Sequence, residues 1–221
     1  MTLSPNDRDG WLTRWREGRI QFHVDTVNPI LDRYVDRLLP EGFGRVFVPL
    51  CGKSVDLGWL DEQGHEAVGV ELAEKAVEDL FKELGRNPTI TTQGAFQSYR
   101  SDGLEVLVGD LFELDAEVTG KFDAIWDRAA LVALRPSDRD RYASHLREFL
   151  QSNGYILLCT ISYDESKMEG PPFSVCADEV HRHFENILCV EKLEGGINTN
   201  PNPCFTESGL DRVLEETWLI G

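Results

Sequence analysis

The sequence predicts an α/β fold in which a mostly parallel sheet carries helices on both faces. The first observation is a strand–loop–helix–strand unit over residues 45–71. Its apolar runs, residues 46–50 and 67–70, are typical of strands buried on both faces. The second observation is that three further apolar runs alternate with amphipathic segments, and the third is a pair of strand-like runs after them. We therefore expect seven strands, a terminal antiparallel hairpin and a single domain over residues 1–221.

Glu71 follows the second strand of the first unit, twenty residues after Cys51. In nucleotide-binding α/β folds, an acid at this place accepts hydrogen bonds from ribose hydroxyls. The connecting loop has one glycine, Gly52, whereas a dinucleotide fingerprint needs three to admit a pyrophosphate. The pattern favours a nucleoside with a small amino-acid tail, such as S-adenosylmethionine (SAM). The alternative is an unliganded unit with an ordinary turn.

The N-terminal region carries Trp11 and Trp15, four residues apart and therefore on one face of a helix predicted over residues 11–22. This helix either caps the domain by packing or forms a lid over a pocket, and residues 1–27 are the expected lid segment. Asn28 and Pro29 then begin a second helix as cap and first residue.

The remaining elements follow from periodicity and turn residues. Helices are expected over residues 54–63, 72–84, 136–150 and 177–184, and strands over 104–108, 122–127, 155–161, 187–193 and 216–220. Residues 87–100 are expected to form a crossing loop with a possible strand at 90–92. Loops are also expected over residues 170–174 and 195–203.

Two polar residues lie just past strand ends, where ligands bind in open α/β sheets. Asp110 could accept a hydrogen bond from an adenine amine, or cap a turn. Arg128 could hold a ligand, or form an ion pair with its neighbour Asp127. The residues alone leave both pairs of alternatives open.

The composition limits the class of partner. A net charge of −17 argues against nucleic acid and against an anionic membrane surface. The chain has no apolar run of signal-peptide or membrane-spanning type, so a cytoplasmic protein is expected. Its five cysteines include no Cys-x-x-Cys pair, which predicts reduced thiols and no metal site. Cys51 lies beside Lys53 but lacks a base placed by sequence, so packing is favoured over a nucleophile.

Several segments resemble the thiopurine S-methyltransferase family. They are residues 15–18, 22–23, 47–57 (FVPLCGKSVDL), 69–71, 122–134 (FDAIWDRAALVAL) and 170–173 (GPPF). The resemblance runs from about Trp11 to Phe184. It implies a Rossmann-like class I methyltransferase fold and a SAM-dependent enzyme that methylates the sulfur of aromatic or heterocyclic thiols.

The resemblance also implies six positions at the methyl donor: Trp15, Leu50, Glu71, Asp110, Leu111 and Arg128. Of these, Asp110 and Leu111 match positions beside the adenine. It shifts the interpretation of Trp15 and Arg128 from packing to ligand binding.

The resemblance says less about the residues that contact the methyl acceptor. Phe22 and Phe173 are candidate apolar walls for an aromatic acceptor, and Arg128 is expected to hold the methionyl carboxylate or to steer an anionic acceptor. No residue is singled out as catalytic, because an aromatic thiol is largely ionised near neutral pH and positioning supplies much of the rate. We expect a monomer acting on a small-molecule thiol.

One segment departs from the family pattern. Some members have a basic, tryptophan-containing segment before the last strand, whereas residues 198–205 here contain no cation. Related members methylate selenium or tellurium oxyanions and halides, so these acceptors, including thiocyanate, are the alternative. A catalytically silent SAM-binding module is the alternative from another class.

Overall fold

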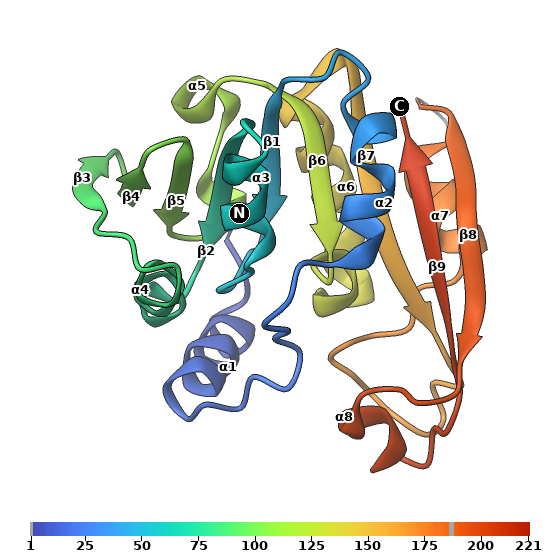
Figure 1. The fold of residues 1–221 in the computed structure, drawn as a ribbon. Coiled ribbons are helices and arrows are strands. Elements are labelled where there is room, and N and C mark those ends of the chain that lie inside the picture. Colours follow the sequence, from blue (N-terminus) through green and yellow to red (C-terminus); the bar gives the residue numbers. More distant parts are fainter. Residues whose placement is uncertain (1, 186–187) are drawn as a thin grey trace.

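The structure is a computed structural model that describes residues 2–185 and 188–221. One nine-stranded sheet runs through it in the order β3-β4-β5-β2-β1-β6-β7-β9-β8 (Figure 1). The strands are β1 (Arg45–Pro49), β2 (Glu66–Glu71), β3 (Thr89–Gln93), β4 (Phe96–Ser101), β5 (Leu104–Val108), β6 (Phe122–Arg128), β7 (Leu150–Ser162), β8 (Val190–Asn198) and β9 (Val213–Ile220). The five central strands, β5 to β7, are parallel, and both outer pairs are antiparallel.

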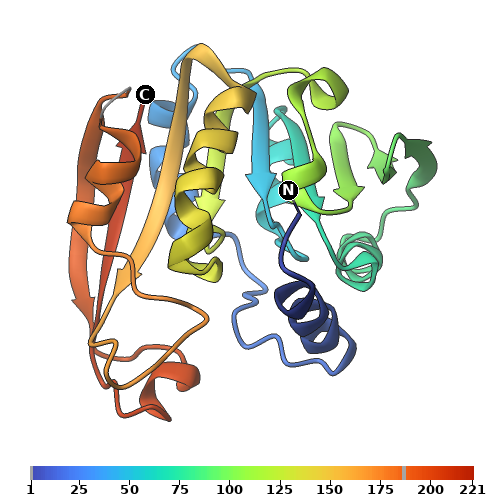
Figure 2. The ribbon, with the colours of Figure 1, turned by 180° about the vertical axis from the view of Figure 1, so that it is seen from behind.

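Helices cover both faces of the sheet. They are α1 (Pro5–Arg16), α2 (Pro29–Leu38), α3 (Asp56–Glu62), α4 (Glu74–Glu83), α5 (Ala116–Thr119), α6 (Pro136–Phe149), α7 (Ala177–Phe184) and α8 (Pro203–Thr206), with single turns η1 (Leu111–Glu113) and η2 (Leu131–Ala133). Helices α2 and α3 lie in front of the sheet in Figure 1, and α6 and α7 cover the opposite face in Figure 2.

Strand β1 explains why the sheet is buried on both faces. Val46 and Val48 pack in the cluster that α2, α3 and α4 cover, whereas Phe47 packs in the cluster that α6 and α7 cover. Side chains alternate between the two faces of a strand, so a continuous apolar run suits a sheet with a helical layer on each side. The expected α/β fold with a terminal antiparallel hairpin is confirmed.

The strand count is the main correction. The sequence predicted seven strands, and the structure has nine, because residues 89–101 form the antiparallel pair β3–β4 around Gly94 (φ +61°). Strand β3 is largely exposed and consists of threonines, Ile90 and Gln93, so it lacks the apolar pattern that marks a buried strand.

Two boundaries also differ. Helix α1 ends at Arg16, and turns without a helix follow it up to the cap at Asn28. Strand β8 extends through Gly195 to Asn198, because its partner β9 continues to pair with it, so the start of the expected loop is strand. The expected start of that strand at Ile187 lies outside the described residues.

Among residues 2–185 and 188–221, no helix combines the length and the apolar character needed to cross a bilayer.

Candidate active site

A cavity lies at the carboxyl ends of the central strands. With its open mouth it encloses about 1090 Å³ of empty space. The tips of β1, β2 and β6 supply one side, the N-terminal segment (residues 2–28) supplies another, and Pro171 and Pro172 close a third. Parallel strands end at one edge of the sheet, which explains why residues far apart in the sequence meet there.

Glu71 lies at the tip of β2 with only 6% of its surface exposed. Its Oε2 accepts a hydrogen bond from the Gly52 N–H at 2.8 Å, and its Oε1 accepts one from the Ala73 N–H at 2.8 Å. Burial raises the pKa of the Glu71 carboxyl, and the two N–H donors offset part of that rise by favouring the anion. Each carboxylate oxygen keeps a second lone pair for a ligand hydroxyl.

The loop after β1 has an unusual backbone. Leu50 (φ +46°) and Gly52 (φ +56°) both adopt left-handed conformations, which cost free energy at a leucine. A Cβ on Gly52 would lie 3.0 Å from Cζ2 of Trp15. Glycine at this position therefore lets the indole rest directly on the loop, and Leu50 is turned onto the cavity wall.

The N-terminal segment is fastened across the cavity by aromatic packing. Phe22 makes edge-to-face contacts with Trp11 at 5.8 Å and with Trp15 at 5.6 Å between ring centroids. Trp15 is 6% exposed and packs against Ala73 and Ala76, where α4 begins. Such aromatic pairs stabilise a packed segment beyond the effect of the area they bury.

Arg128 lines the cavity and donates a hydrogen bond from Nη1 to the backbone oxygen of Phe22 at 3.2 Å. No ion pair joins it to Asp127 within the described part of the chain, because neighbouring residues on a strand face opposite ways. Asp127 is fully buried and accepts hydrogen bonds from Ala130 N, Leu131 N and Tyr142 Oη. Those bonds anchor the turn after β6 and so fix the position from which Arg128 extends.

Asp110 and Leu111 lie beside the cavity and are not part of its lining. Asp110 is 1% exposed, and its Oδ2 accepts from the Leu3 N–H at 2.8 Å while its Oδ1 accepts from the Phe112 N–H at 3.0 Å. The turn-capping role expected for Asp110 is therefore present. Leu3 itself lines the cavity.

Phe173 also lies off the lining, although its neighbours Pro171 and Pro172 are part of it. Its N–H donates to Val132 O at 2.6 Å, and the guanidinium groups of Arg135 and Arg139 lie about 6 Å from its ring. Of the predicted site residues, the structure brings together Trp15, Phe22, Leu50, Glu71 and Arg128.

The sequence analysis did not single out three basic residues that line the cavity. They are Arg14, His23 and Lys53. None belongs to a periodic pattern, and the one available signal was that His23 follows Phe22 in a family-like segment. Cys51 also lines the cavity, but it is 7% exposed and packs against Gly69, where a Cβ would lie 2.7 Å from its sulfur. Burial first, and then the nearby Glu71, raise the pKa of its thiol, which agrees with a packing role.

Two solved structures that share this fold are named as methyltransferases. The chain resembles 1,6-didemethyltoxoflavin-N1-methyltransferase of Burkholderia thailandensis, solved with S-adenosylhomocysteine, with a TM-score of 0.61 and 17% identity over 96% of this chain and 86% of that one. A SAM-dependent methyltransferase from Anabaena variabilis gives a TM-score of 0.62 and 14% identity over 100% and 96%. These likenesses show that the chain has the class I methyltransferase fold.

Sequence relatives identify the family more narrowly. The family model for thiopurine S-methyltransferase matches residues 6–221. The thiopurine S-methyltransferase of Pseudomonas aeruginosa (strain UCBPP-PA14) is 43% identical over 212 residues, which cover 96% of this chain and 97% of that protein. That of Azotobacter vinelandii is also 43% identical, with the same coverage. The chain therefore belongs to the thiopurine S-methyltransferase family, and it is a SAM-dependent methyltransferase, as its sequence predicted.

Proposed function

We propose that the chain transfers the methyl group of SAM to the sulfur of an aromatic or heterocyclic thiol. The observation that carries this proposal is the composition of the cavity wall. Rings and aliphatic side chains from Trp11, Phe22 and Val132, together with Pro171 and Pro172, form an apolar slot, and the cation of Arg128 lies among them. An apolar wall with a cation beside it suits a flat, ionised thiol.

The donor would lie between the strand tips and the N-terminal segment. Glu71 is proposed to accept hydrogen bonds from the ribose hydroxyls, with Leu50 and Trp15 against the rest of the donor. The fit is supported by Gly52, whose missing side chain lets the indole of Trp15 pack on the loop whose N–H binds Glu71. When bound, SAM supplies an electrophilic methyl group on a sulfonium.

The adenine is proposed to lie beside Leu111 and Asp110. Asp110 is only 1% exposed and bonded to Leu3 N, so an adenine amine reaches its carboxylate only if residues 2–4 shift. Phe22 and Arg128 are proposed for the acceptor side. Phe173 supports that side from behind Pro172, and no direct contact with the acceptor is assigned to it.

The chain's own residues would act mainly by positioning. Arg128 has no carboxylate partner within the described residues, and its hydrogen bond to Phe22 O leaves other guanidinium N–H groups available. It is proposed to hold the methionyl carboxylate or to orient the acceptor anion. Holding the two reactants in line accounts for much of the rate of a displacement reaction.

The test is formation of S-adenosylhomocysteine from SAM with a panel of acceptors. Thiophenol, a thiopurine, selenite, tellurite and iodide are supplied separately, and the methylated product is identified by mass. Turnover with the two thiols and none with the others supports the proposal. Turnover with the oxyanions or the halide alone would show that these, and not thiols, are the acceptors. Donor binding without turnover on any acceptor would indicate a silent SAM-binding module.

The proposal includes a monomer working in the cytoplasm. Light scattering should give a mass near 25.0 kDa at assay concentrations.

A further inference from the structure

His23 lines the cavity, and its imidazole has no hydrogen-bond partner among the described residues. His23 lies on the lining between Phe22 and Val24, which also line the cavity, and its backbone N–H donates to Ile20 O at 2.8 Å. No side-chain or backbone group within residues 2–185 and 188–221 hydrogen bonds to either ring nitrogen. The backbone bond therefore holds the chain at His23, while the ring nitrogens remain available to a ligand.

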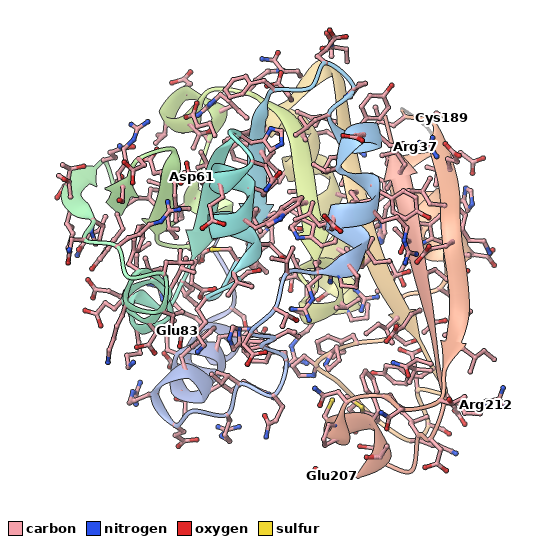
Figure 3. All side chains as sticks on the ribbon, viewed as in Figure 1. Arg37, Asp61, Glu83, Cys189, Glu207 and Arg212 are labelled. Carbon is pink, nitrogen blue, oxygen red and sulfur yellow. The ribbon has the colours of Figure 1, made fainter. Side chains whose placement is uncertain are left out.

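Charged groups from four elements face this ring. Lys53 comes from the loop after β1 and Arg128 from the tip of β6, while Asp25 lies on the N-terminal segment itself and Glu83 on α4. Glu83, labelled in Figure 3, forms an ion pair with Lys53 at 2.5 Å. Burial first, then the cations Lys53 and Arg128, lower the pKa of His23, and the carboxylates of Glu83 and Asp25 offset part of that effect. At neutral pH the imidazole is uncharged and carries a free lone pair.

The other titratable groups on the lining cannot take up a proton as readily. Each oxygen of Glu71 accepts one backbone N–H, and its remaining lone pair is the one proposed to accept a ribose hydroxyl, so the carboxylate is occupied while the donor is bound. The Cys51 thiol stays protonated, because burial raises its pKa. Arg14, Lys53 and Arg128 are cations and have no lone pair to offer near neutral pH.

We propose that His23 is the proton acceptor for thiols that reach the cavity un-ionised. This inference rests on the proposed function and extends its acceptors from ionised aromatic thiols to thiols that are neutral at pH 7. The S–H bond breaks as the proton moves to an imidazole nitrogen. The sulfur electron pair forms a bond to the methyl carbon, while the carbon–sulfonium bond breaks and its electrons stay on the donor sulfur. The products are a thioether, S-adenosylhomocysteine and an imidazolium, which passes its proton to water.

Two acceptors of similar size separate this role from simple positioning. 4-Nitrothiophenol is a thiolate at pH 7, whereas phenylmethanethiol ionises well above neutral pH, as a cysteine thiol does. His23→Asn should lower kcat/KM for phenylmethanethiol about 100-fold, the usual scale for losing a general base. It should change kcat/KM for 4-nitrothiophenol less than threefold.

The pH profile supplies a second readout. With phenylmethanethiol, the wild-type rate should level off once His23 is neutral, whereas the variant should gain about tenfold per pH unit until the thiol itself ionises. His65→Asn is the matched control, because burial also lowers the pKa of His65, but its ring stacks on Phe43 beside the start of β2, away from the cavity. Calorimetry with S-adenosylhomocysteine reports whether each variant keeps its donor site.

The outcomes are distinct. A selective loss with the neutral thiol and a changed profile support the role of His23. Equal losses with both thiols, or no loss with either, overturn it. If the wild-type enzyme methylates neither thiol, the proposed function fails first and this inference with it.

Discussion

At the scale of single residues, the carboxylate of Glu71 has one structural role and one proposed binding role. It holds the Gly52 and Ala73 N–H groups, and it is the proposed anchor of the donor ribose. Glu71→Ala should weaken binding of S-adenosylhomocysteine by about 1.5–3 kcal/mol, because hydrogen bonds to a charged acceptor are lost. Calorimetry measures the effect, with Glu78→Ala on the exposed side of α4 as control. Unchanged affinity in a folded Glu71→Ala protein would remove Glu71 from the donor site.

Arg128 gives a second residue-scale prediction. Arg128→Lys keeps the charge but loses the planar fork, so kcat/KM for an aromatic thiol should fall about tenfold, equivalent to about 1.4 kcal/mol. The melting temperature should hardly change, because Arg128 has no ion pair with Asp127 to lose. Arg37→Lys is the control, since Arg37, labelled in Figure 3, forms an exposed ion pair with Glu191, and neither residue lines the cavity. A melting-temperature loss that parallels the activity loss would indicate a structural role for Arg128.

Asp127 links pH to stability. Burial raises its pKa from 3.8 to about 6 in the folded protein. The folded state thus binds the proton more tightly, and the resulting stabilisation is present below about pH 4 and lost as pH rises through about 6. Relative to Asp127→Asn, the unfolding free energy of the wild type should decrease by up to about 3 kcal/mol between pH 4 and 7. Denaturant unfolding at several pH values measures this difference, and parallel profiles for the two proteins would contradict it.

At the scale of elements, several contacts tie the N-terminal segment to the rest of the chain, among them the ion pair of Asp7 with Arg135 and the packing of Trp15 on Ala73 and Ala76. The segment is also joined by Leu3 N to Asp110, by Trp15 resting on Gly52, by Phe22 O to Arg128, and by the Asn202 side chain to Gln21 O. Deleting residues 1–27 should abolish donor binding, because the proposed cover over Gly52 is lost. The sheet should still fold, since α2 begins at its own cap, Asn28.

Calorimetry and circular dichroism of the truncated protein test this prediction. Trp15→Ala, which removes only the indole on Gly52, is the milder companion variant. Retained affinity after the deletion would assign the segment to packing alone.

Elements were predictable from sequence where both faces are buried. The central strands show continuous apolar runs because helices cover each side, as Val46 and Phe47 on β1 illustrate. Strand β3 was expected only as a possible strand over residues 90–92, β4 was not predicted, and the end of β8 was placed in a loop. Strands β3 and β8 lie at the edges of the sheet, where a strand takes its pairing from its neighbour and needs little apolar pattern.

The site residues were predictable where a charged side chain follows a strand directly. Glu71 and Arg128 follow apolar runs, so the edge they share could be expected. The contact between Asp110 and Leu3 could not, because 107 residues separate them and no local pattern records the pairing. The proposed role of His23 could not be predicted either, since it depends on the proximity of Lys53 and Arg128, which are distant in the sequence.

At the scale of the whole molecule, the net charge of −17 should attract the positively charged donor before it binds. SAM carries one more positive charge than S-adenosylhomocysteine, so an acidic protein attracts it more strongly. Raising the ionic strength from about 0.01 to 0.15 M shortens the screening length from about 30 to 8 Å. The affinity for SAM should therefore fall roughly two- to tenfold relative to that for S-adenosylhomocysteine. Calorimetry at both ionic strengths measures the ratio, and equal salt dependence of the two ligands would exclude this steering.

The position of β9 between β7 and β8 has a consequence for biosynthesis (Figure 1). Residues 45–162 contain seven of the strands and emerge from the ribosome first. The outer edge of β7 must then stay open until residues 213–220 arrive to pair with it. An unpaired edge beside a growing core is a site of aggregation. The nascent chain is therefore most in need of chaperone protection along β7, during synthesis of roughly its last quarter.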